Sequence, residues 1–177
     1  MQIPLIQYYY TNSPKIVPII IGTTNSNTLK KIAEALKPWF TPDNLFVISS
    51  DFSHYPSYKD AVMTDNLTAE GLISGNPQTF LNTLEKNSSR NVSNLATSMC
   101  GWTSGLVILH LVAGNKNLVF KRIDYCNSGD SPYGNKDEVV GYHAIVLIEK
   151  NNDSKQAEKS SEGFTFSRDE IAELFII

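Results

Sequence analysis

The apolar positions of this chain fall into short runs typical of strands, separated by stretches with helical spacing. The runs at 15–22 (KIVPIIIG) and 45–50 (LFVISS) predict two strands, although Pro18 is unusual inside a strand. Between these runs, apolar residues recur at i, i+3, i+4 and i+7, which predicts an amphipathic helix carrying Leu29, Ile32, Ala33 and Leu36. A strand–helix–strand order of this kind predicts a parallel pair with a right-handed crossover.

The alternation continues to residue 149. Helices are expected over 60–74 and over 102–114, and a further helix should begin at the Asn76-Pro77 start signal between them. The buried face of the first of these should carry Val62, Met63, Leu67, Leu72 and Ile73. Strands are predicted at 118–125 and 139–149. The fold class is therefore α/β, with helices on both faces of a mainly parallel sheet, that is, a three-layer α/β/α arrangement. The apolar start MQIPLIQYYY needs a packing partner, so this sheet should be incomplete at its N-terminal side.

The composition changes after residue 149. Residues 150–163 are polar and charged and predict a linker. Ser167 and Glu170 form a capping-box pattern, and Phe166 can pack on Ile171, so a new helix is expected over 164–177. We interpret 1–149 as part of one domain and 164–177 as the first helix of a truncated following domain.

Charge and composition exclude several classes of protein. The 177 residues carry a net charge of −3 with acidic and basic residues interspersed, which gives no electrostatic basis for binding nucleic acid or a membrane surface. No apolar run approaches a membrane span, and the N-terminus lacks the pattern of a signal peptide. Two cysteines do not make a disulfide framework, so a reduced, cytoplasmic protein is expected.

Residues 49–55, SSDFSHY, follow the second predicted strand and form the densest cluster of reactive side chains. Parallel sheets place ligands beyond the carboxyl ends of their strands, where Asp51 and His54 would lie. An aspartate can fix the tautomer of a histidine and make it a general acid or base. The alternative is that Asp51 only caps a turn, because Asp-x-x-His is a common spacing.

Cys100, in MCGWTSG, directly precedes a predicted helix. Free amides and the helix dipole favour a thiolate there, which is either a nucleophile or a soft metal ligand; the alternative is a buried, inert thiol. His110 and His143 are interpreted as packed residues, Asp130 as a turn aspartate, and Cys126 receives no role. The chain has no CxxC pair, HExxH, Walker loop or GxGxxG.

Four motifs, SSDFSHY, CGWTS, YCNSGDSPYG and VVGYHAIVL, resemble the Memo family (AmmeMemoRadiSam system protein B-like) in order and spacing, over roughly residues 1–149. The resemblance implies the α/β/α fold of class III extradiol dioxygenases, with a mononuclear non-haem iron site. It implies that His54 is the acid–base group, that Asp51 is its partner, and that Cys100 is a metal ligand. Iron is the first expectation and copper the second, since a thiolate–imidazole set suits either.

Family members carry two further metal-binding histidines in an N-terminal half, and none of His54, His110 and His143 matches them. The resemblance therefore covers a C-terminal half, which should bind metal weakly or not at all. The terminal FTFSRDEIAELF resembles the opening helix of an AMMECR-type domain. Three functions remain open: a metal-dependent redox protein, a phosphopeptide-binding module without chemistry, and an inactive fragment. The ligand would be a small molecule or peptide, and the exposed N-terminal side is a surface for association.

Overall fold

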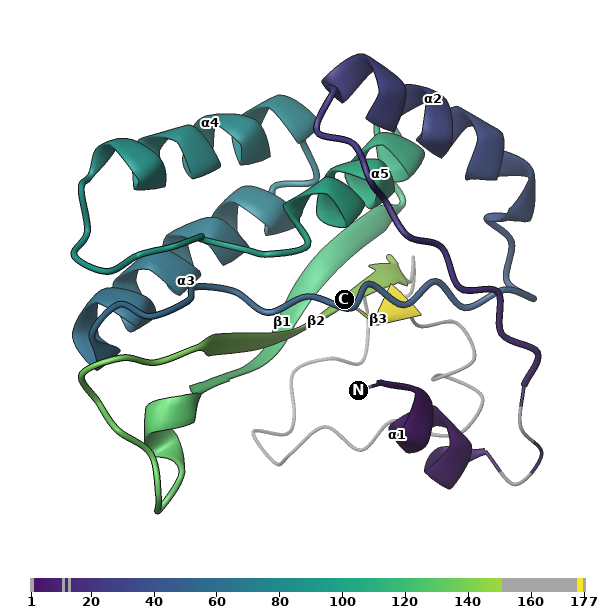
Figure 1. Ribbon diagram of the computed structural model, residues 1–177. Helices are drawn as coiled ribbons and strands as arrows, with labels where there is room; N and C mark the ends of the chain where they lie inside the picture. The colour runs from purple at the N-terminus through teal and green to yellow at the C-terminus, as the bar shows by residue number, and fades with distance from the viewer. Residues whose placement is uncertain (1, 11, 13, 151–174, 177) are drawn as a thin grey trace, which may run out of the picture.

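The computed structural model combines a group of helices with a small antiparallel sheet, and it describes residues 2–10, 12, 14–150 and 175–176 (Figure 1). The α-helices of this part are α1 (Gln2–Tyr9), α2 (Ser26–Leu36), α3 (Tyr58–Ile73), α4 (Pro77–Ser89) and α5 (Trp102–Val112). Its strands are β1 (Leu118–Asn127), β2 (Gly141–Glu149) and β3 (Phe175–Ile176), and its short 3₁₀ turns are η1 (Lys37–Trp39) and η2 (Ser128–Asp130). The prediction of a mixed α/β protein is confirmed.

Side-chain caps set where the helices begin. Asn25, Ser57 and Asn76 each accept a hydrogen bond from the backbone amide three residues further on, at the starts of α2, α3 and α4. Such caps satisfy amides that have no partner inside the helix. The predicted helix after Asn76-Pro77 is confirmed, and Pro38 lies in η1, where α2 has ended.

The core is built around α5, which is apolar on all sides. Its residues Gly105–Leu109, Leu111 and Val112 are buried, as expected for a helix enclosed by others. Helix α5 packs against α2 and α4, while α3 packs on β1 and β2. Figure 1 shows α1 well apart from these helices. The largest fully buried side chains of the core include Phe52, Phe80, Leu106, Ile108, Ile145 and Leu147.

The sheet has the order β1-β2-β3, and both pairings are antiparallel. Strand β1 runs against β2 from the Leu118–Glu149 pair to the Asn127–Gly141 pair, with a bulge between Arg122 and Asp124. Before the bulge, Arg122 reaches Asn66 and Glu70 on α3. After it, the side chain that returns to α3 is Tyr125, whose hydroxyl reaches Asp65. The bulge thus keeps both halves of β1 facing the same helix.

The two strands predicted at 15–22 and 45–50 are not formed. Both segments run extended, yet neither belongs to a ladder within the described residues. The mainly parallel, three-layer sheet is therefore absent from the described part of the chain, whose ladders are antiparallel. The physical reason is that a strand needs a neighbour for its amide and carbonyl groups, and the apolar pattern reports only the side chains. Ile16, Val17, Ile19 and Ile20 are accordingly exposed.

The buried face of α3 also differs from the prediction. Met63 is 43% exposed, and Val62 and Leu67 are only half-buried. Leu72 is buried as predicted, but the helix otherwise buries small and polar residues, among them Ala61, Thr64, Asp65, Thr68 and Ala69. Asn87 of α4 donates to the Thr68 hydroxyl at 2.9 Å, so this face is held by hydrogen bonds between helices as well as by apolar contact.

The predicted linker and most of the predicted C-terminal helix lie outside the described residues. Only Phe175–Ile176 of that region is described, as β3 paired with Val146 and Leu147 of β2. The division into domains therefore stays a prediction. Among the described residues, no helix combines the length and apolarity that a membrane crossing requires.

Candidate metal centre

The segment carrying Asp51 and His54 is held along one edge by the start of β2. Phe52 donates its amide to the Gly141 carbonyl at 2.8 Å, and Gly141 donates back to the Ser53 carbonyl at 2.9 Å. Tyr55 then donates to the Val139 carbonyl at 2.7 Å. Tyr55 has φ of 72°, a left-handed conformation uncommon for a bulky residue, so the chain turns sharply just after His54. These bonds fix the path of the segment although it is no regular strand.

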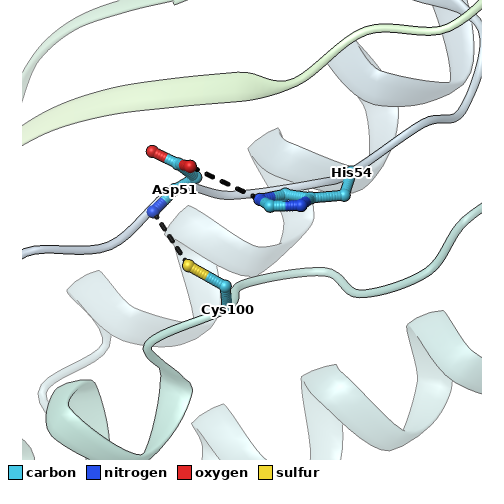
Figure 2. A group of neighbouring side chains, drawn as sticks. All are labelled: Asp51, His54 and Cys100. Atoms are coloured by element: carbon cyan, nitrogen blue, oxygen red, sulfur yellow. Dashed lines mark hydrogen bonds and ion pairs between the residues drawn. The ribbon is translucent and has the colours of Figure 1, made fainter.

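The opposite edge of the segment is held by the loop that leads to α5. His54 donates its amide to the Thr97 carbonyl at 3.2 Å, and Ala96 donates to the His54 carbonyl at 3.1 Å. Thr97 lies three residues before Cys100, so the same loop delivers the cysteine. The structure brings SSDFSHY and MCGWTSG together in space, as the resemblance implies by giving both segments residues of one metal site (Figure 2).

Asp51, His54 and Cys100 form one cluster. A carboxylate oxygen, an imidazole nitrogen and the thiol sulfur all lie within 4.8 Å of one another. His54 Nε2 is 3.5 Å from Asp51 Oδ2, an ion pair when the imidazole is protonated, although the contact lacks hydrogen-bond geometry. The Asp51 side chain is 42% exposed and Cys100 is exposed, whereas His54 is 23% exposed and its Nε2 atom is buried.

The thiol of Cys100 is held from the Asp51 side. Asp51 donates its backbone amide to Sγ at 3.2 Å, and the Ser50 hydroxyl lies 3.6 Å from the same sulfur. Gly101 donates its amide to Ser50 Oγ at 2.8 Å, and its bare Cα lets the backbone come this close. Amide hydrogen bonds to sulfur are a means by which proteins tune a thiolate ligand.

The donor set fits a transition metal. Thiolate and imidazole suit copper, iron and zinc, and carboxylate adds an anionic oxygen ligand. Three protein ligands with an open position are typical of catalytic metal sites. Bonds of ~2.0–2.3 Å to one ion hold two donor atoms at most ~4.6 Å apart. The donor atoms here lie within 4.8 Å of one another, so a small side-chain movement would let them share an ion. The cluster is therefore a candidate metal centre.

The residues that the sequence predicts to be structural lie elsewhere. Asp130 caps η2 by accepting from the Asn127 amide at 2.8 Å, and it accepts from the Tyr58 hydroxyl at 2.6 Å, so its turn role is confirmed. The Tyr58 hydrogen bond, followed by the Asn127 bond, lowers the pKa of the Asp130 carboxyl. His110 is half-buried on α5, and burial lowers the pKa of its imidazole.

Sequence reasoning missed two residues that bear on the cluster, Ser50 and Asp65. Ser50 belongs to SSDFSHY but receives no role from the sequence, whereas its hydroxyl contacts both Cys100 and Gly101. Asp65 also receives no role from the sequence, yet it is fully buried behind the cluster. A signal existed for Asp65: with Ala61, Ala69 and Leu72 it lies on a stripe at helical spacing, opposite the larger apolar residues.

Fold and cluster together define a mixed α/β protein with a candidate thiolate–imidazole–carboxylate centre. A family model described as "Memo-like protein" matches residues 1–146. A MEMO1 family protein of Thermoplasma volcanium is 31% identical over 146 residues, which cover 82% of this chain and 50% of the relative. The chain belongs to the Memo-like family, and the resemblance of its motifs is confirmed.

Other relatives show the same coverage. A MEMO1 family protein of Thermoplasma acidophilum is 28% identical over 148 residues, covering 84% of this chain and 51% of the relative. One from Methanosarcina mazei is 28% identical over 153 residues, covering 83% and 53%. This chain spans about half the length of the relatives that it matches.

Proposed function

We propose that the chain carries part of a metal-dependent redox centre, in which Cys100 ligates an iron or copper ion and His54 is the adjacent acid–base group. The observation that carries the proposal is the convergence of Asp51, His54 and Cys100 within 4.8 Å from segments 46 to 49 residues apart in sequence. Membership of the Memo-like family supports it, because the resemblance implies an iron site of the extradiol dioxygenase type.

Each residue of the cluster has a separate task. The Cys100 thiolate holds the ion and is oriented by the Asp51 amide. Asp51 uses its carboxylate to orient the His54 imidazole, 3.5 Å away, and to balance its charge when it takes up a proton from substrate. Iron or copper, when bound, would supply the redox step. Asp51 and Cys100 are the exposed side of the cluster, so a substrate would approach from there.

Anaerobic titration with Fe(II), and with Co(II) as a spectroscopic probe, tests the proposal. A bound thiolate gives Co(II) a charge-transfer absorption, so wild-type protein should show this band and Cys100→Ala should lose it. Cys126→Ala is the matched control, because Cys126 is also free and exposed but lies outside the cluster. Equal metal binding by Cys100→Ala and wild type would contradict the proposal. Binding should be weak overall, because the family's two further histidines have no counterpart in this chain.

The rival function, recognition of a phosphorylated peptide, has less physical support. Phosphate sites use arginine, lysine or backbone amides, whereas this cluster presents the Asp51 carboxylate to an incoming anion. Arg122 has its own partners, Glu70 and Asn66 on α3. Titration with a phosphotyrosine peptide decides the matter: saturable binding that His54→Ala abolishes would favour the rival.

The parallel three-layer sheet of the family also enters as a proposal. We infer that segments 15–22 and 45–50 become strands of such a sheet when further strands pair with them. Their support is the extended backbone and the exposure of Val17 and Ile20, which are 80% and 94% exposed. The same association would bring further ligands to the cluster, because residue 50 adjoins Cys100. Amide exchange tests this: slow exchange at 16–20 in the isolated monomer would contradict it.

A further inference from the structure

Asp65 is a fully buried carboxylate behind the candidate metal centre. It lies on α3 with no exposed surface, and within the described residues no arginine, lysine or histidine forms an ion pair with it. Burying a charged group without a counter-ion is costly unless hydrogen bonds or a nearby cation offset the cost. Its position therefore calls for a physical explanation.

Two hydrogen bonds hold the carboxylate. Ser53 donates its backbone amide to Oδ1 at 2.8 Å, and Tyr125 donates its hydroxyl to Oδ2 at 2.8 Å. Gly141 lies against the same oxygen, since a Cβ there would come within 1.8 Å of Oδ2. Asp65 thus occupies space that exists because β2 begins with a glycine.

The Ser53 amide links Asp65 to the cluster. Ser53 lies two residues after Asp51 and directly before His54, and its carbonyl accepts from Gly141. The segment is therefore held from α3 as well as from the two flanking backbones. Loss of the Asp65 contact would free the peptide that sets the spacing of the aspartate and the histidine.

The charge of Asp65 also acts on the cluster. Burial raises the pKa of the Asp65 carboxyl, while the hydrogen bonds from Ser53 and Tyr125, and then charge on His54, lower it in part. The contact itself places the carboxylate close to the imidazole, because Ser53, whose amide Asp65 accepts, directly precedes His54. Positive charge at the cluster stabilises the ionised carboxylate, and by reciprocity the carboxylate stabilises that positive charge.

We propose that Asp65 is the positioning residue of the Asp51–His54–Cys100 cluster: its carboxylate fixes the Ser53 amide, and its negative charge stabilises a cation bound in front of it. The cation is the divalent metal of the proposed function, so the second part rests on that function. The first part rests only on the contacts of this chain.

Comparison of Asp65→Asn with Asp65→Ala separates the two parts. Asparagine keeps an oxygen for the Ser53 amide and offers an N–H to the Tyr125 hydroxyl, but it removes the charge. We expect the Ser53 amide to exchange slowly with solvent in wild type and Asp65→Asn, and rapidly in Asp65→Ala. Co(II) affinity should fall about ten-fold in Asp65→Asn and further in Asp65→Ala, as for other residues that support a metal ligand indirectly. Glu70→Gln, which removes an exposed carboxylate of the same helix, is the matched control.

Four outcomes decide the proposal. Slow Ser53 exchange in a folded Asp65→Ala would overturn the positioning role, and equal Co(II) affinity of wild type and Asp65→Asn would overturn the electrostatic role. If Asp65→Ala fails to fold, Asp65→Asn serves as the test of the positioning role: rapid Ser53 exchange in folded Asp65→Asn would overturn it. If wild type binds no Co(II), the proposed metal function fails and the electrostatic role fails with it, while Ser53 exchange still decides the positioning role.

Discussion

Asp51 and Cys100 exchange hydrogen bonds in both directions. The Asp51 amide donates to Cys100 Sγ at 3.2 Å, and the Cys100 amide donates to the Asp51 carbonyl at 3.0 Å. These two hydrogen bonds join the segment that carries the imidazole to the loop that carries the thiol. A change that displaces either segment should disturb the other.

Gly101→Ala should test this coupling. A Cβ at Gly101 would lie 2.7 Å from Ser50 Cβ and 2.8 Å from Ser50 Oγ, so the two segments must separate. We expect a loss of ~1–3 kcal/mol in the free energy of unfolding, as for overpacking elsewhere, measured by urea denaturation. Gly22→Ala is the control, since no described atom lies within 4 Å of its Cβ position. An equal decrease in the free energy of unfolding in the two variants would show that Ser50 moves aside without an energetic cost.

His143 should make stability depend on pH. Its ring lies 4.6 Å from those of Phe52 and Tyr125, and burial, followed by the charge of Arg122, lowers the pKa of its imidazole from 6.5 to about 4. The unfolded chain therefore binds this proton more readily. Above pH 6.5 the imidazole is neutral in both the folded and the unfolded chain, so it does not lower the free energy of unfolding. As the pH falls from 6.5 towards about 4, only the unfolded chain takes up the proton, and the free energy of unfolding decreases.

The size of this loss is on the order of 3 kcal/mol at most, from the difference between the two pKa values. Asp65 acts in the opposite direction, because burial raises the pKa of its carboxyl and protonation on acidification relieves that cost. The His143 contribution is isolated by comparing wild type with His143→Phe, which keeps a ring between Phe52 and Tyr125. Urea unfolding from pH 7 to 4 should show a shallower decline for the variant; parallel declines would count against the prediction.

Ile20→Lys should reduce self-association without loss of the fold. Ile20 is 94% exposed on an extended segment that no described strand pairs with, and exposed apolar edges promote association. We expect a lower apparent mass at high concentration by light scattering, with unchanged thermal unfolding of the monomer. Ile21→Lys is the contrasting variant, because Ile21 packs against the core and its replacement should destabilise the fold. An unchanged apparent mass in Ile20→Lys would place the association surface elsewhere.

Asn87→Ala should loosen the contact between α3 and α4. The buried amide donates to the Thr68 hydroxyl at 2.9 Å and to the Thr64 carbonyl at 3.4 Å. Removing a buried hydrogen-bonding group of this kind costs ~1–3 kcal/mol, which chemical denaturation can measure. Asn82→Ala is the control on the same helix, because Asn82 is exposed and bonds only Gln78. A cost no larger than that of Asn82→Ala would mean that the helices pack without this amide.

Helix positions could be predicted from the sequence because their signals are local. Asn76 caps a helix as expected, and the apolar run after Gly101 is the buried helix that its pattern indicates. Strand pairing is different, because a partner far along the chain decides it. The β-branched run ending at Ile21 has the side chains of a buried strand, but no strand among the described residues pairs with it. The pattern alone therefore predicted the wrong element.

The candidate site shows the same division. Asp51 and His54 could be chosen together because they are three residues apart, and Cys100 joined them only through the resemblance of motifs. The helical stripe that contains Asp65 could indicate its burial, but not its partner, because Tyr125 lies on a strand 60 residues away. The pairing of two polar groups that are distant in the chain leaves no periodic trace in the sequence.

The bulge in β1 has a consequence for chain length. Ile123 is the extra residue between Arg122 and Asp124. Arg122 before the bulge and Tyr125 after it both have side chains that contact α3. Deleting Ile123 would restore regular alternation and leave Tyr125 on Asp65. Deleting Lys121 instead would turn Phe120 out of the core. Strand β1 can therefore lose one residue at the bulge without turning over either half, and a chain shortened by that residue should keep the same buried contacts.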